Sequence, residues 1–360
     1  MRDHLDKKLG IITEIWNEYI MQYRFCNSQI KFTPDVQTNY FGDIIKYFSD
    51  TNNIIYNKKN ALTIHENIEN SISFLQAIYI QQDFVIELLH IFKCNIENNP
   101  LKNNINYFLN REIRNELVGH PIRKIDLNGT RQLKSSTIFS NSTNSEQISY
   151  LRYHIDNNYS FEEVTYFKKD IIKRHDLFIE FYFDLIINKL KDVISSFKIK
   201  ILDFEITLQY ATFKNIITVV SHSFEYIFTI NFIYNPEILL KIYYLKNKNL
   251  RYSNAIEMFR RDLKHFIQYR TMKITEFIEG TKNDNSNQID KKISQVSYHY
   301  ELGKLIDNTC INDFRFFSSL LRNKCKDNQI ILEELDNMEK NFKNELEYYC
   351  SYYLICNELN

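Results

Sequence analysis

The chain has 360 residues, of which 44% are hydrophobic and 25% charged, a composition typical of globular proteins and one that excludes a disordered or collagen-like chain. Its 45 basic and 45 acidic side chains cancel, so no global charge indicates a nucleic-acid or membrane partner, and any such site must be local. Only 6 glycines and 4 prolines interrupt the chain, which favours long helices over a many-stranded sandwich or barrel.

The first ten residues, MRDHLDKKLG, are charged where a secretory signal needs an apolar stretch, so we expect a cytoplasmic protein. The longest apolar region, 216–234, is interrupted by polar side chains and favours a buried element over a membrane span. The six cysteines form no C-x-x-C pair and have no histidine at metal-ligand spacing nearby. This pattern predicts reduced core cysteines, no metal site and no cofactor.

Two helices and a hairpin are expected in the first part of the chain. Residues 61–93 contain no Gly or Pro and repeat apolar side chains every three or four positions, which predicts a long amphipathic helix. A second helix is expected from about Leu101 to Gly119, where the glycine would form a left-handed cap and Pro121 would prevent continuation. Between 130 and 155, the runs TIF and ISYLRY predict a β-hairpin.

The remainder reads mostly as helix. Ser160 and Glu163 have the spacing of a capping box, so a third long helix is expected to begin there and to reach about residue 200. From 201 to 234, helix and strand both stay open, because the runs are short, β-branched and without a turn signal. After Pro236 the chain reads helical to its end, with polar breaks at 246–249 and 280–288.

The segment REIRNELVGHP, residues 111–121, offers a chemical argument. Five residues separate Arg114 from His120, and Asn115 directly follows the arginine. Histidine can take or give a proton at neutral pH, and arginine presents a planar fork of donors to phosphate oxygens. Because RNA carries its own nucleophile, the 2′-hydroxyl, its cleavage needs only proton transfer and stabilisation of a crowded, negatively charged phosphorus centre.

This segment resembles the Arg-x(4–6)-His motif of the HEPN superfamily, in which Asn, Asp or His typically follows the arginine. The preceding helix, with AIYIQQDF at 77–84, resembles uncharacterised bacterial proteins of this kind, and the likeness covers roughly residues 60–200. It implies a metal-independent endoribonuclease of toxin or antiviral systems, acting as a homodimer with the motif at the interface. The implied catalytic residues are Arg114, His120 and Asn115, and the implied partners are RNA, a second copy, and an antitoxin or regulatory protein.

The expected fold is therefore mainly α. It comprises a HEPN-like helical bundle with a β-hairpin insertion at about 130–155, inside a first domain at 1–215. A helical C-terminal region of unknown role follows at 216–360.

Local charge favours a nucleic-acid partner. Residues 111–134 contain six basic and three acidic side chains, a net charge of +3 in a neutral protein. We expect Arg111, Arg123, Lys124 and Arg131 to bind the phosphate backbone. Gln82 and Asp83 are candidates for supporting the motif from the preceding helix.

Other interpretations stay open. The bare Arg-x(4–6)-His spacing is expected by chance in a chain with this many arginines and histidines, and a second match runs from Arg260 to His265, where Arg261 replaces the small polar residue. Arg114 could instead pair with Glu116 or Asp83, His120 could cap carbonyls at the helix end, and Gln82 and Asp83 could merely link two helices. The alternative function is a non-catalytic HEPN-like module that binds a nucleotide or a protein.

Overall fold

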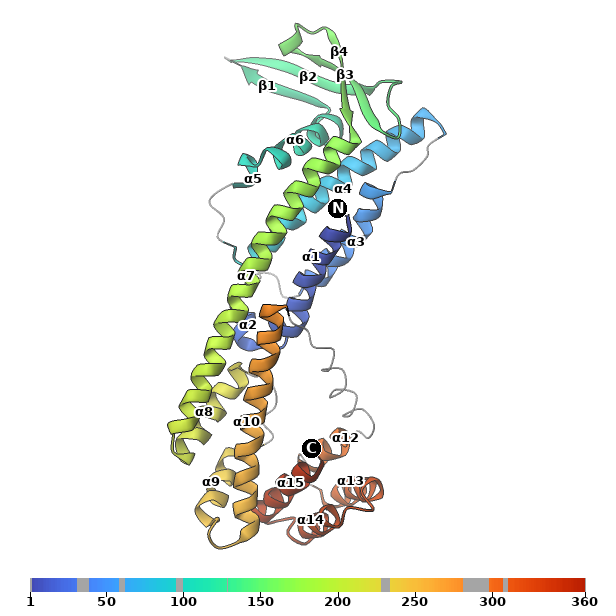
Figure 1. The fold of residues 1–360 in the computed structure, drawn as a ribbon. Coiled ribbons are helices and arrows are strands. Elements are labelled where there is room, and N and C mark those ends of the chain that lie inside the picture. Colours follow the sequence, from blue (N-terminus) through green and yellow to red (C-terminus); the bar gives the residue numbers. More distant parts are fainter. Residues whose placement is uncertain are drawn as a thin grey trace. The chain divides into compact units, whose positions relative to one another are not determined.

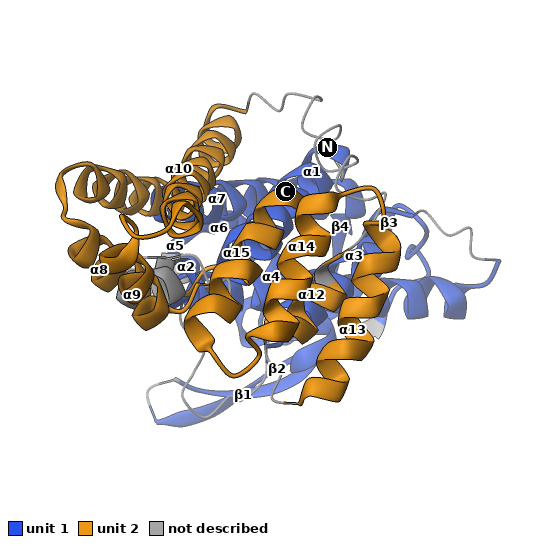
Figure 2. Cartoon of the chain, turned by 90° about the horizontal axis from the view of Figure 1, so that it is seen from below, with its two compact units in different colours: residues 1–21, 26–193 blue, residues 22–25, 194–360 orange. Residues whose placement is uncertain are grey.

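The computed structural model describes residues 2–30, 39–57, 62–94, 100–127, 129–227, 234–280, 298–306 and 310–359. The protein is mainly helical and carries a four-stranded antiparallel sheet (Figure 1). Two compact units divide the chain: unit 1 contains residues 1–21 and 26–193, and unit 2 contains residues 22–25 and 194–360 (Figure 2). Helix α7 (Lys168–Tyr210) contributes to both, so these units divide the chain earlier than the domains expected at 1–215 and 216–360.

Unit 1 is built on the long helix α4, which confirms the helix expected at 61–93. Thr63 caps its first turn in a reciprocal capping box with Glu66, and no glycine or proline interrupts it. The other helical elements before the sheet are α1 (Arg2–Ile15), the π-helical turn η1 (Trp16–Ile20), α2 (Arg24–Ser28), α3 (Phe41–Tyr56), α4 (Ile64–Ile91), α5 (Pro100–Asn103), α6 (Ile105–Arg114) and the π-helical turn η2 (Asn115–Gly119).

The helix expected from 101 to 119 is in fact three pieces. Asn104 ends α5 and caps α6, because its side chain accepts hydrogen bonds from the N–H groups of Asn106 and Tyr107. After Arg114 the chain widens into η2, which the N–H of His120 closes by donating to the Asn115 carbonyl at 2.7 Å. The left-handed cap expected at Gly119 is wrong, since among the described glycines only Gly129 and Gly280 have positive φ.

The sheet contains the expected hairpin and two further strands. Its strands are β1 (Ile122–Leu127), β2 (Thr130–Phe139), β3 (Gln147–His154) and β4 (Phe161–Phe167), in the order β1-β2-β3-β4. The pairing of Phe139 with Tyr150 confirms the hairpin of TIF with ISYLRY. Gly129, with a φ of +78°, lies in the tight turn between β1 and β2, where glycine relieves the backbone strain.

The capping box expected at Ser160 and Glu163 is wrong, because β4 occupies this segment and α7 begins only at Lys168. In β4 the half-buried residues Val164 and Tyr166 alternate with exposed ones, which is the period of a strand. The carboxylate of Glu163 accepts a hydrogen bond from the Ser140 hydroxyl instead of capping a helix. Pairing with β3 therefore decides the structure here.

Helices and sheet of unit 1 share one hydrophobic core. Side chains from α3, α4, α6, η2, β3 and α7 meet in it: Ile55, Phe74, Leu75, Ala77, Ile78, Ile113, Leu117, Ile148, Tyr150 and Ile171. Ile113 and Leu117 come from the segment that carries the Arg114–His120 motif. The core thus fixes the backbone of the motif from behind, between α4 and the sheet.

The described elements of unit 2 are helical, as expected for the C-terminal region. After the end of α7 they are α8 (Phe213–Ile227), α9 (Pro236–Leu245), α10 (Leu250–Glu279), α12 (His299–Ile306), α13 (Ile311–Lys324), α14 (Gln329–Lys340) and α15 (Glu345–Leu359). The open choice at 201–234 is settled as helix for 201–210 and 213–227, while 228–233 lie outside the described residues. The break at 246–249 is confirmed; of the break at 280–288, Gly280 caps α10 in a left-handed conformation and the rest lies outside the described residues.

Each of the six cysteines is a thiol outside any disulfide, and five of them are buried. The core interpretation is wrong for Cys310, which is exposed. Within the described ranges, no helix combines the length and apolarity needed to cross a bilayer.

Candidate active site

Arg114 ends α6 and is held by neutral groups. Its Nε and Nη2 both donate to Oε1 of Gln76 on α4 at 3.2 Å, and its Nη1 donates to Oδ1 of Asn115 at 3.3 Å. The guanidinium carbon lies 3.8 Å from the ring centroid of Tyr79, a cation–π contact. Arg114 forms no ion pair with any carboxylate in the described part of the chain, so its positive charge is not neutralised locally.

Gly119 lets this guanidinium approach the backbone of η2. A Cβ atom at Gly119 would lie 2.4 Å from Nη1 of Arg114 and 3.4 Å from Oδ1 of Asn115. The absence of a side chain, not backbone freedom, is therefore what this position requires. The contact brings the Arg114 guanidinium against the residue that immediately precedes His120.

His120 follows η2 with φ −140° and ψ 62°, outside the helical region, and the residue is exposed. Its backbone N–H closes the π-helical turn, but no hydrogen bond of its imidazole is found among the described residues, so the suggested capping of helix carbonyls does not occur through its side chain. Arg114, Asn115 and His120 are thus gathered around one turn of chain. The imidazole is exposed, and Gly119, which precedes it in the chain, lies against the Arg114 guanidinium.

Arg111, one turn before Arg114, has a different environment. Its Nη1 pairs with Asp83 at 2.8 Å, its Nη2 donates to the Tyr79 hydroxyl at 2.9 Å, and its guanidinium carbon lies 4.1 Å from the same ring. Burial lowers the pKa of Arg111, but the hydrogen bond to Asp83 and the electrostatic contributions of Asp83, Tyr107 and Tyr79 together outweigh it and raise that pKa above its ordinary value. The partner suggested for Arg114 belongs to Arg111 instead.

Gln82 is fully buried, and its Nε2 donates to the Tyr107 carbonyl at 3.3 Å. Gln82 and Asp83 therefore both link α4 to α6, as the structural interpretation of this pair supposed. Their contribution to the motif is to hold α6 in place.

Glu116, on η2, is the centre of a buried polar cluster. Its carboxylate accepts from Arg152 Nη2 at 2.8 Å, from Arg123 Nη2 at 3.3 Å and from the Tyr150 hydroxyl. Burial raises the pKa of Glu116, but the hydrogen bonds from Tyr150 and Arg152 more than offset it and hold that pKa below its usual range. Glu116 thus binds side chains of the sheet and forms no ion pair with Arg114.

His154, also buried beside this cluster, has its pKa lowered by burial and by the positive charges of Arg152, Lys134 and Arg123. Its Nε2 and the Ser136 hydroxyl lie 3.4 Å apart, within hydrogen-bond distance. The backbone N–H of His154 donates to Oδ1 of Asn157 at 3.1 Å. These contacts tie β2, β3 and the turn after β3 together.

The structure separates the residues expected to bind RNA. Arg123 reaches Glu116 and Glu112 on the face of the sheet that covers η2. Lys124 lies on the opposite face, because neighbouring strand residues alternate, and Arg131 shares that face with its cross-strand partner Asp126. Lys134 pairs with Asp156 and Arg111 with Asp83, so carboxylates from outside the 111–134 segment reduce its positive charge.

Three residues that contact the motif were not identified from the sequence: Gln76, Tyr79 and Arg152. Gln76, Tyr79 and Asp83 recur at three- and four-residue spacing on one face of α4, and Tyr150, Arg152 and His154 alternate along one face of β3. These two periodicities are the sequence signals from which Gln76, Tyr79 and Arg152 could have been identified.

The second sequence match has another geometry. Arg260 and His265 lie inside the continuous α-helix α10, where positions five residues apart are about 140° apart around the axis. No π-helical turn and no helix end lies between them to bring the two side chains together. Of the two sequence matches, the Arg114–His120 segment is therefore the better candidate for an arginine and a histidine that act on one substrate.

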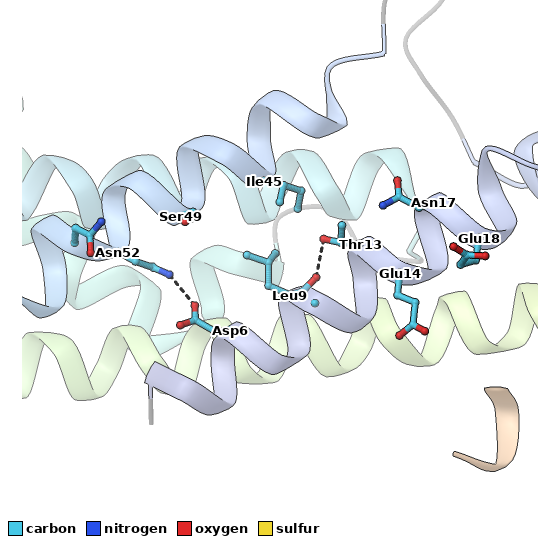
Figure 3. A pocket seen from close by; sticks show the side chains of 11 residues that line it. Asp6, Leu9, Thr13, Glu14, Asn17, Glu18, Ile45, Ser49 and Asn52 are labelled. Carbon is cyan, nitrogen blue, oxygen red and sulfur yellow. Dashed lines mark hydrogen bonds between the residues drawn. The ribbon is translucent and has the colours of Figure 1, made fainter. Parts of the chain in front are cut away.

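A separate hollow of about 630 Å³ lies between α1 and α3. Its polar lining includes Asp6, Glu14 and Glu18; Asp6 accepts a hydrogen bond from Asn52 at 3.0 Å, and Thr13 donates to the Leu9 carbonyl (Figure 3). Carboxylates in this position would repel a phosphodiester. Within the described residues, no group of three His, Cys, Asp or Glu side chains is placed to hold a metal ion.

Comparison of the chain with known protein families, with curated proteins and with solved structures found no match.

Proposed function

We propose that the protein is a metal-independent endoribonuclease of the HEPN type, acting in a toxin or antiphage defence system. The observation that supports it is the position of Arg114: its guanidinium is held by Gln76, Asn115 and Tyr79, carries no carboxylate partner among the described residues, and lies against the residue next to an exposed histidine. Three of its five N–H donors are used by the protein. The remaining donors can bind phosphate oxygens.

In the proposed reaction the RNA 2′-oxygen attacks the adjacent phosphorus. His120 moves a proton, either from the 2′-hydroxyl or to the departing 5′-oxygen, and Arg114 stabilises the negative charge that develops on the phosphate oxygens. Asn115 keeps the guanidinium aligned through its Oδ1. The P–O5′ bond breaks as the P–O2′ bond forms, leaving a 2′,3′-cyclic phosphate and a 5′-hydroxyl.

The experiment is RNA cleavage by the purified full chain in EDTA. Cleavage should produce cyclic or 3′-phosphate ends, DNA should stay intact, and His120→Ala should lower the rate by on the order of 10² to 10⁴. His265→Ala is the matched control, since α10 does not bring Arg260 next to it, and its rate should stay within a few-fold of the parent. Loss of cleavage on chelation, or an unchanged His120→Ala rate, contradicts the proposal; RNA binding without cleavage supports the non-catalytic alternative.

A homodimer is part of the proposal, because cleavage needs one group to remove a proton and one to supply it, while a single chain offers one His120. Helix α6 exposes Ile105, Phe108 and Leu109 by 61%, 47% and 40%, an apolar surface next to the motif that a second copy could cover. Mixing His120→Ala with Arg114→Ala protomers should restore a trace of activity if two chains build one site. A fully active monomer in sedimentation experiments contradicts the shared site.

A further inference from the structure

A second cavity in unit 1 is independent of the motif. It has a volume of about 430 Å³, within the size range of small-molecule sites, and lies where the end of α3, the first turns of α4, the turn before β3 and the start of α7 meet. Its apolar wall includes Ile55, Phe74, Phe167 and Ile172. Ile55 and Phe74 belong to the hydrophobic core of unit 1, and Ile172 packs against it. The wall is therefore built on rigid elements.

Lys168 is the unusual residue of this cavity. It is half-buried, its Nζ lies 5.9 Å from the Phe74 ring centroid, and it donates to the Asn144 carbonyl at 3.3 Å. An ammonium group has three donors, and in the described part of the chain no carboxylate forms an ion pair with this one. Burial alone lowers the pKa of Lys168, which agrees with a charge removed from water without an acidic neighbour.

The other polar groups around the cavity suit an anion. Asn67, Asn70 and Ser73 follow one another at three-residue spacing on α4 and line it with amide and hydroxyl donors. Lys169 adds a second positive charge, and Glu146 is the acidic residue of the lining. Two ammonium groups against one carboxylate leave the cavity lining with a net positive charge.

We propose that this cavity is a binding site for a small organic anion. A phosphate or carboxylate group would meet Lys168 and the donors of Asn67 and Asn70, and an apolar ring would lie against Phe74, Phe167 and Ile172. Binding would place a negative charge against a half-buried cation, which a neutral ligand cannot do. The inference does not depend on the ribonuclease activity.

Calorimetric titration of the full chain with phenyl phosphate, benzoate and benzyl alcohol tests the site. One or both anions should bind with a dissociation constant of about 1 mM or tighter, and at least about tenfold more tightly than the neutral alcohol. The two anions distinguish a phosphate from a carboxylate ligand. Absence of anion binding, or equal binding of the alcohol, overturns the proposal.

Two variants and a control locate the binding. Lys168→Met should weaken binding of the preferred anion at least about tenfold. Lys173→Met, five residues further along α7 at an exposed position outside the cavity, should leave that binding unchanged. Ser73→Phe fills the cavity from an exposed helix position, so it should abolish binding even if Lys168→Met does not fold. Equal weakening by Lys168→Met and Lys173→Met, or unaltered binding by Ser73→Phe, shows general surface attraction and overturns the site.

Discussion

Two polar clusters of unit 1 lie on either side of one π-helical turn, and they differ in how their charges are satisfied. Around Glu116, a buried carboxylate is bound by two arginines and a tyrosine, so each charge has a partner. Around Arg114, the partners are a glutamine, an asparagine and an aromatic ring, and the neighbouring histidine is exposed. A satisfied cluster stabilises a fold, whereas a cation held in place by neutral groups stays able to bind an anion.

The largest expected effect is on the Glu116 cluster. Glu116→Ala leaves Arg152, Arg123 and Tyr150 without their shared acceptor, so the free energy of unfolding should fall by about 3–5 kcal/mol in urea denaturation. Glu112→Ala, which removes a partly exposed carboxylate 3.7 Å from Arg123, should cost less than about 1 kcal/mol. Equal losses for the two variants would contradict the central role of Glu116 in its cluster.

The next largest expected effect is a pH dependence of the free energy of unfolding, which arises from a histidine away from the motif. His175 is fully buried, donates to Gln81 at 2.8 Å, and burial lowers its pKa to about 3 from 6.5. The unfolded chain therefore binds one more proton than the folded one between those two pH values. Stability is fully present above pH 6.5 and should fall by about 1.4 kcal/mol per pH unit as the pH drops toward 3.

The comparison of the parent with His175→Gln isolates this contribution. Asp176, whose burial raises its pKa, acts in the opposite direction in both proteins and cancels in the difference. Urea denaturation at pH 7, 6 and 5 should show a weaker acid dependence in the variant. The same slope in both proteins would assign the pH dependence to other groups.

Gly119→Ala tests whether the position of the Arg114 guanidinium affects activity independently of the stability of the fold. The new Cβ would lie 2.4 Å from Nη1 of Arg114, so the flexible side chain must move, at a stability cost of less than about 1 kcal/mol. RNA cleavage should nevertheless fall by about tenfold or more, because the guanidinium loses its alignment. Gly10→Ala on α1, where a Cβ meets no atom within 4 Å, should add about 0.5–1 kcal/mol and leave cleavage unchanged.

The smallest effect concerns the far face of the sheet. If Lys124 contacts a phosphate, Lys124→Ala should lower RNA affinity a few-fold and reduce the slope of log affinity against log salt by about 1. Arg123→Ala should instead lower stability, since Arg123 is paired with Glu116. Filter binding over a series of salt concentrations measures the first change; an unaltered slope removes Lys124 from the RNA surface.

Local patterns predicted the elements that depend on local sequence. The apolar period of 61–93 gave α4, the runs TIF and ISYLRY gave β2 and β3, and the break at 246–249 was found from its polar residues. The period of a helix or strand, and the residues that end one, are properties of neighbouring side chains. The sequence also singled out Arg114, Asn115 and His120, through their spacing together with the asparagine that follows the arginine and the resemblance to the HEPN motif.

Tertiary contacts decided the rest. Ser160 and Glu163 match a helix cap, yet pairing with β3 makes the segment a strand, because ladder hydrogen bonds to a distant segment outweigh one local cap. Gly119 was expected to serve backbone conformation, whereas a guanidinium from five positions earlier requires the missing side chain. Helix α4 supplies Gln76 and Tyr79 to Arg114, and Asp83 to Arg111. Only the packing of α4 on α6 assigns these partners, since a charge pair depends on distance in space and not on separation in sequence.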